Sequence, residues 1–79
     1  MPDASTRITV RLFATFRKGR FIESEESYPG GTTIGDIIAG LGIESKEVGI
    51  ILLNGRRAEP DRVLEEGAQL ALFPLLGGG

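Results

Sequence analysis

The sequence contains no cysteine and no histidine. Without cysteine, the chain can form no disulfide framework and no thiolate metal site, and it has no thiol nucleophile. Without histidine, it lacks the usual general base near neutral pH and the commonest neutral metal ligand. The 11 acidic residues are scattered through predicted turns and helix ends. We therefore expect a chain that binds no metal and is not catalytic alone.

Basic charge and long apolar runs are also scarce. The formal net charge is −2, which argues against a nucleic-acid binder. The longest apolar run, residues 50–53, is far too short to cross a membrane, and the polar residues 1–6 do not resemble a secretory signal. The lack of cysteine fits a reducing compartment. We expect a soluble cytoplasmic protein that binds neither nucleic acid nor a membrane.

The length of 79 residues allows one domain with a single small core. At this size, most apolar residues are needed for packing. We expect three parts along the chain, namely a flexible N-terminal tail at residues 1–6, a folded domain at residues 7–74 and an extended, glycine-rich tail at residues 75–79.

Five stretches of the sequence are predicted to form β-strands. The first, residues 7–12, alternates apolar and polar residues, which is typical of a strand with one buried face. Residues 48–53 are almost continuously apolar, which predicts a strand covered on both faces. Asn54-Gly55 is the strongest hairpin signal, because a type I′ turn needs two residues that tolerate positive φ. The other predicted strands are residues 21–28, 56–58 and 69–73.

One main helix is predicted between residues 33 and 42. Thr33 is the expected N-cap, with Asp36 three residues later, and Gly42 is expected to end the helix. A brief helical piece is also expected within residues 60–64. Together these elements predict an α+β fold, in which one mixed sheet of four to five strands has a single main helix packed on one face.

The chain ends in three glycines, and the segment from Leu75 to Gly79 follows the last predicted strand. Five extended residues could reach on the order of 16 Å, and glycines have no side chains to obstruct entry into a narrow channel. The terminal carboxylate can therefore enter the active site of another protein. Adenylation by ATP would make its oxygen a good leaving group, and sulfide attack would then give a thiocarboxylate. Taken alone, such a tail is better explained as a terminus without function.

From about Ile8 to Gly79, the chain resembles the small subunit of molybdopterin synthase and the related thiamine-type sulfur carriers. The resemblance rests on several short motifs and on their order and spacing. That family has the β-grasp, ubiquitin-like fold, which agrees with the predicted elements. The matching residues are 10–14 with 16–17, 33–41, 53–55, 63–64 with 66–67, 72–74, and 78–79.

The resemblance implies roles for the last residues. Gly79 would carry the acyl-adenylate and then the thiocarboxylate, while Gly78 would keep the approach narrow. A ubiquitin-activating-type adenylating enzyme would use the ATP, so this chain would bind no cofactor. The large subunit of molybdopterin synthase would then accept the tail. Sulfur would pass to a cyclic pterin precursor, and the chain would be the sulfur-donating subunit in molybdenum or tungsten cofactor biosynthesis.

The residues before Gly78 are the predicted contacts with these partners. Phe73 could pack in the core or contact a partner equally well, since aromatic residues anchor many interfaces. Leu75 and Leu76 lie past the last predicted strand, so a groove of a partner explains them better than the core. The predicted partner-binding residues are Phe73, Pro74, Leu75, Leu76 and Gly77.

Three other functions remain open. The chain could supply sulfur to thiamine thiazole or cysteine synthesis, with the same chemistry at Gly79 and a different acceptor. It could be a ubiquitin-like modifier that forms isopeptide bonds with lysines. It could also be a non-catalytic interaction module in which the glycine tail has no role.

The position of Leu75 can be tested by charge substitution. If Leu75 lies in a partner groove, Leu75→Asp weakens partner binding and leaves the thermal melt nearly unchanged, because the free domain does not bury this side chain. Binding titrations and thermal denaturation measure the two effects. A large loss of stability would instead place Leu75 in the core.

Overall fold

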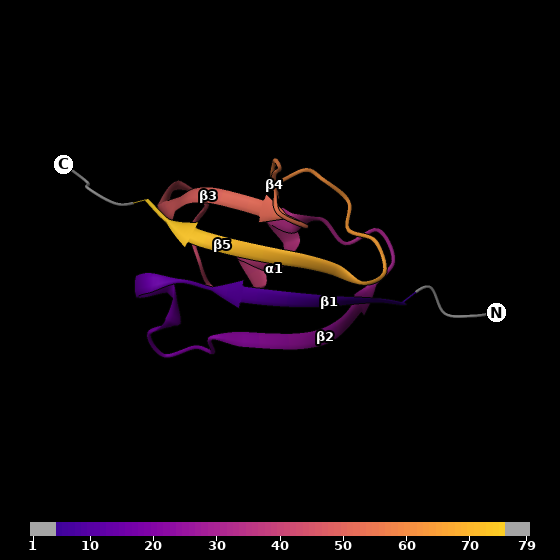
Figure 1. The fold of residues 1–79 in the computed structure, drawn as a ribbon, viewed down its shortest axis with the longest axis horizontal. Helices are drawn as coiled ribbons and strands as arrows, with labels where there is room; N and C mark the ends of the chain where they lie inside the picture. Colours follow the sequence, from indigo (N-terminus) through magenta and orange to yellow (C-terminus); the bar gives the residue numbers. More distant parts are fainter. Residues whose placement is uncertain (1–4, 76–79) are drawn as a thin grey trace.

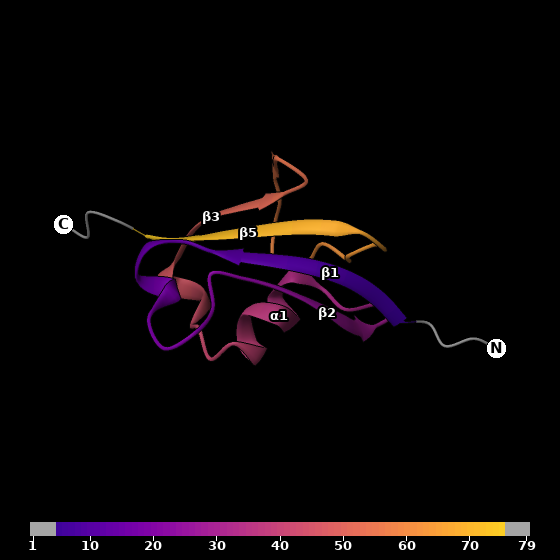
Figure 2. The same cartoon turned by 60° about the horizontal axis from the view of Figure 1, so that its bottom comes forward.

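A computed structural model describes residues 5–75 of the chain (Figure 1). Its strands form one mixed sheet in the order β2-β1-β5-β3-β4, in which the β1–β5 pair is parallel and the other pairs are antiparallel. One α-helix, α1, lies on one side of this sheet (Figure 2), as the sequence predicts. The elements are β1 (Ser5–Leu12), η1 (Ala14–Arg17, a 3-10 helix), β2 (Glu23–Pro29), α1 (Ile34–Gly40), η2 (Ser45–Glu47, a 3-10 helix), β3 (Val48–Leu53), β4 (Arg56–Arg57) and β5 (Ala68–Pro74).

The core fills the space between the sheet and α1. It is built by the alternate residues of β1 and β5 that face the helix, together with three isoleucines of α1. Burial of each such side chain stabilises the fold by about 1.5–3 kcal/mol relative to exposure. Within residues 5–75, no polar or charged side chain is buried. The fully buried side chains are Ile8, Val10, Leu12, Ile34, Leu70 and Leu72.

The predicted caps of α1 and the predicted Asn54-Gly55 turn are both confirmed. The Thr33 hydroxyl accepts a hydrogen bond from the Asp36 N–H at 3.1 Å, and the Asp36 carboxylate accepts one from the Thr33 N–H at 3.0 Å. Gly42 has φ +78° and follows the helix. In the hairpin, Asn54 has φ +52° and Gly55 has φ +85°, as a type I′ turn requires. Because α1 has only seven residues, its stability depends on packing against the sheet.

The predicted helical piece within residues 60–64 is wrong. This segment is an irregular turn, and the carbonyls of Pro60 and Arg62 accept hydrogen bonds from N–H groups in the first turn of α1. The Pro60 carbonyl accepts from the Gly35 N–H at 2.8 Å, and the Arg62 carbonyl accepts from the Ile34 N–H at 3.0 Å. Those N–H groups have no partner inside the helix, so a loop that satisfies them is favoured.

Three strand predictions also need correction. The strand predicted at residues 21–28 is β2, which begins at Glu23, two residues later than expected. β1 begins at Ser5, two residues earlier than expected, because Ser5 and Thr6 pair with the end of β2. Strand β3 is covered on one face only. Ile51 and Leu53 are buried, but Ile50 is 42% exposed. A continuous apolar run does not by itself tell whether both faces are covered.

Neighbouring residues of β5 face opposite sides of the sheet, and their substitution should separate the two sides. Leu72 is fully buried, so we expect Leu72→Ala to lower the free energy of unfolding by about 2–5 kcal/mol. Phe73 is half-buried on the other face. We expect Phe73→Ala to cost about 1 kcal/mol, mainly for a lost aromatic contact. Urea denaturation measures both values, and equal losses would place Phe73 in the core.

Candidate functional site

The structure describes three of the seven predicted site residues: Phe73, Pro74 and Leu75. Phe73 and Pro74 are the last residues of β5, which runs through the middle of the sheet between β1 and β3 (Figure 1), and Leu75 follows them. Four predicted residues lie outside the described part of the chain: Leu76, Gly77, Gly78 and Gly79. Their predicted roles stay predictions.

The three described residues have different surroundings. Pro74 is buried on the helix side of the sheet, whereas Phe73 is half-buried on the opposite side. Leu75 follows the last residue of β5, and it is 63% exposed. Its backbone is nevertheless held, because the Leu75 N–H donates to the Glu47 carbonyl at 2.8 Å. The segment before the glycines is thus anchored through its backbone and leaves the leucine side chain free.

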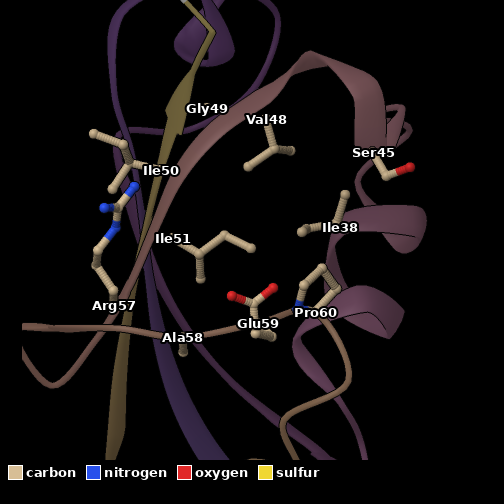
Figure 3. Close-up of a pocket in the computed structure, with 10 residues that line it drawn as sticks. All are labelled: Ile38, Ser45, Val48, Gly49, Ile50, Ile51, Arg57, Ala58, Glu59 and Pro60. Carbon is tan, nitrogen blue, oxygen red and sulfur yellow. The ribbon is translucent and has the colours of Figure 1, made fainter.

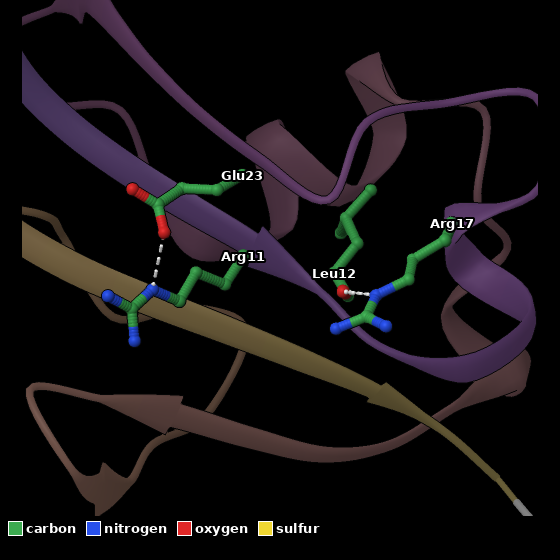
Figure 4. A network of polar contacts seen from close by, with 4 residues as sticks. All are labelled: Arg11, Leu12, Arg17 and Glu23. Atoms are coloured by element: carbon green, nitrogen blue, oxygen red, sulfur yellow. Dashed lines mark hydrogen bonds and ion pairs between the residues drawn. The ribbon is translucent and has the colours of Figure 1, made fainter.

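An aromatic stack lies beside this anchor. The rings of Phe13 and Phe73 are stacked, with centroids 4.2 Å apart and an interplanar angle of 12°. The Arg17 guanidinium lies 5.2 Å from the centroid of the Phe13 ring. Its Nε donates to the Leu12 carbonyl at 2.7 Å (Figure 4), which holds it in place. Of the two alternatives for Phe73, the structure therefore supports a position outside the buried core.

The stack belongs to a larger apolar surface on the face of the sheet that α1 leaves uncovered. Ile50 is the cross-strand partner of Phe73, and Leu52 is the partner of Ala71, so these side chains share one face. Part of this face is hollowed, with a volume of about 570 Å³. Exposed apolar surface with a polar rim is typical of interaction sites. We call the following residues the apolar patch: Phe13, Ile50, Leu52, Ala71 and Phe73.

Ion pairs occupy the β1–β2 side of the same face. Arg11 pairs with Glu23 at 2.9 Å (Figure 4), and Arg7 pairs with Glu25 at 3.0 Å. All four side chains are more than half exposed. Pairs of this kind contribute about 0–1 kcal/mol, so their main effect here is to make one half of the face polar.

Sequence reasoning missed most of the apolar patch. Phe13 follows a predicted strand, and only the structure brings it to Phe73. Ile50 and Leu52 were expected to be covered, because residues 48–53 are almost continuously apolar. The alternation of buried and exposed residues in β3 is visible only once its pairing with β5 is known.

Three basic side chains and the acidic Glu47 lie beside the exposed Leu75. Lys18 and Arg20, from the turn after η1, line a depression around Leu75 together with Lys46 of η2. The Arg20 guanidinium is held by bonds to the carbonyls of Leu41 at 3.0 Å and Phe16 at 3.2 Å. The positive charge of these side chains therefore lies close to the start of the tail.

A second groove lies on the helix side of the sheet (Figure 3), with a volume of about 540 Å³. Its wall contains Ile38 and Ile51, and Figure 3 shows Ile51 pointing toward α1 while Ile50 points away. The polar side chains of the groove are Ser45, Arg57 and Glu59. No hydrogen bond or ion pair among the described residues links these three, so the groove contains no nucleophile–base pair of the kind that catalysis needs.

The rest of the described chain adds little chemistry. Burial raises the pKa of the Tyr28 phenol, and the nearby carboxylate of Glu26 raises that pKa further. Tyr28 pairs with Thr6 at the far end of β1, away from Leu75. Within residues 5–75, no group of three acidic, histidine or cysteine side chains is placed to hold a metal ion. No helix in this range is long and apolar enough to span a membrane.

Similar proteins support this picture of the fold. A protein of Haloferax volcanii, HVO 2177, is 24% identical with a TM-score of 0.80, and the match covers 100% of this chain and 92% of that one. The putative molybdopterin converting factor subunit 1 of Pyrococcus furiosus is 26% identical with a TM-score of 0.72, covering 90% and 99%. The small archaeal modifier protein 1 of H. volcanii is 23% identical with a TM-score of 0.72, also covering 90% and 99%.

A more distant likeness is found in a complex of subunits 1 and 2 of the molybdopterin-converting factor from Helicobacter pylori 26695. It is 18% identical with a TM-score of 0.58, covering 94% of this chain and 100% of that one. No curated protein matches the sequence. The family model that matches residues 10–79 is that of the ThiS family. The chain therefore belongs to the ThiS family, and its fold is the ubiquitin-like β-grasp.

Proposed function

We propose that this chain is a sulfur carrier whose terminal Gly79 is adenylated and thiocarboxylated by a partner enzyme. It would then donate the sulfur as the small subunit of a molybdopterin synthase-type complex. One observation supports this most directly. The backbone of Leu75 is bound to Glu47 while its side chain stays exposed, and the sequence beyond Leu76 consists only of glycine. This arrangement suits a tail that another protein's active site receives.

The proposed chemistry needs little from this chain. A carboxylate oxygen of Gly79 attacks the α-phosphorus of ATP, pyrophosphate leaves, and an acyl-adenylate forms. Sulfide (HS⁻) then attacks the acyl carbon, AMP leaves and the proton passes to a base, so that the chain ends in a thiocarboxylate. The sequence has no histidine or cysteine to act as base or nucleophile. Proton transfer and ATP binding would therefore belong to the adenylating enzyme, in the cytoplasm, where ATP is available.

Each partner would contact the apolar patch and the tail at the same time. Phe73 and Leu75 lie two residues apart, one in the patch and one at the root of the tail, so a partner that covers the patch also receives the tail. The likeness to a complex of two molybdopterin-converting subunits supports a large-subunit partner. The adenylating enzyme and the large subunit would bind in turn, because a single tail can enter only one active site at a time.

A second function, that of a ubiquitin-like modifier, is favoured by the similarity to another protein. The small archaeal modifier protein 1 of H. volcanii has the same fold and similar length. An activated Gly79 could react with a lysine amine instead of sulfur, which would form an isopeptide bond. Sulfur carriers for thiazole or cysteine synthesis would use the same tail. These functions differ only in what reacts with the activated Gly79.

The central test is the mass of the intact protein after incubation with a cognate adenylating enzyme, ATP and a sulfur donor. We expect replacement of one oxygen by one sulfur at the C-terminus. A variant that lacks Gly78 and Gly79 should stay unchanged, because its shortened tail does not reach the active site. An unmodified wild-type chain, beside an enzyme shown to be active on another carrier, would contradict the proposal.

The acceptor can be identified with the loaded protein. Addition of a synthase large subunit and a cyclic pterin precursor should return the mass to that of the carboxylate while the pterin gains sulfur. If sulfur is retained with the pterin and lost with a thiazole or cysteine precursor, the alternative carriers are favoured. Lysine conjugates that contain the tail would instead identify a modifier.

A further inference from the structure

Gly49 lies where β3 meets the root of the tail. A Cβ atom placed on Gly49 would lie 2.9 Å from the Leu75 Cα and 2.9 Å from the Pro74 carbonyl oxygen. Both neighbours are backbone atoms, which cannot rotate away as the end of a side chain could. Gly49 does not have a positive φ, so its backbone conformation suits any residue. Glycine is required here by the close approach of two backbones.

The local pairing of the strands explains this close approach. Val48 pairs with Pro74 and Ile50 pairs with Phe73, so Gly49 is an extra residue at a register shift in β3. Bulges of this kind bend a strand and redirect the segments beside them. One residue before the bulged strand, the Glu47 carbonyl accepts the Leu75 N–H at 2.8 Å. We call this arrangement of residues 47–49 against residues 74–75 the tail clamp.

We propose that Gly49 is a positioning residue for the reaction at the C-terminus. By allowing β3 to approach Pro74 and Leu75, it sets the position of the Leu75 backbone, to which the last four residues are joined. This inference rests on the proposed function and adds to it the group that aims the tail. The apolar patch would dock the domain on a partner, and the tail clamp would set where the terminal carboxylate arrives.

The reach of the tail makes the position of its root important. Four extended residues span about 13 Å. A tail that must cross most of that distance from Leu75 to the reacting atoms of the partner cannot compensate for a displaced root. A methyl group at residue 49 would force the two backbones apart by about 0.5 Å to restore ordinary contact distances. In catalysis, a misplacement of about 1 Å can cost roughly 100-fold in rate. A small displacement at Leu75 is therefore expected to reduce turnover.

The test compares Gly49→Ala with Gly40→Ala. Gly40 lies in α1, and a Cβ there would have no neighbour within 4 Å, so Gly40→Ala makes the same chemical change without a clash. Amide exchange of the Leu75 N–H reports on the tail clamp without any partner. Steady-state loading by the adenylating enzyme reports on function, with this chain as the varied substrate.

We expect Gly49→Ala to speed exchange of the Leu75 N–H at least tenfold and to lower kcat for loading about tenfold, with KM nearly unchanged. KM should be retained because the apolar patch still docks. Gly40→Ala should match the wild type in both measurements. A merely structural role would give another result, since partial unfolding lowers the concentration of folded substrate, raises the apparent KM and leaves kcat unchanged.

Two outcomes would overturn the inference: a raised KM with unchanged kcat, or unchanged loading despite faster exchange of Leu75. If the wild type is not loaded at all, the proposed function fails, and the Leu75 exchange rate still shows whether Gly49 holds the tail root. If Gly49→Ala does not fold, Leu75→Pro and Leu75→Ala decide. Both remove the leucine side chain, but only Leu75→Pro removes the N–H that Glu47 accepts. Equal kcat for this pair would contradict the tail clamp.

Discussion

The parallel pairing of β1 with β5 is the interaction on which the rest of this structure depends. It places the last strand of the chain in the middle of the sheet, with β3 bonded to its other edge. A central strand can leave the sheet only if two hydrogen-bonded ladders break, whereas an edge strand loses one. The root of the tail is therefore fixed to a strand held on both edges, which under the proposed function would let a partner bind the tail without opening the fold.

The two faces of β5 serve different purposes because side chains alternate along a strand. Leu70 and Leu72 complete the core beneath α1, while Ala71 and Phe73 form part of the apolar patch. A domain of this size has few apolar residues beyond those in its core. The apolar patch uses a large share of those that remain. The exposed ion pairs of β1 with β2 make that side of the face polar, so the patch lies mainly on β5 and β3.

The lack of histidine and cysteine agrees with the proposal that partner enzymes catalyse the reaction at Gly79. Under the proposed function, the chain would contribute an apolar surface, a held backbone at Leu75 and a terminal carboxylate, and proton transfer would be left to its partners. In that role its fold would have two tasks, which are to be recognised and to deliver its end to a defined place.

Local signals in the sequence determined much of this protein. The capping box of Thr33 and Asp36, the Asn54-Gly55 turn, the alternation in β1 and the terminal glycines each depend on residues a few positions apart. Only the tertiary structure decided the rest. The loop at residues 60–64 is not helical because its carbonyls accept hydrogen bonds from the start of α1, and Ile50 is exposed because α1 covers the other face of the sheet. Gly49 is needed because β5 passes against it, and contacts between distant segments leave no local pattern in the chain.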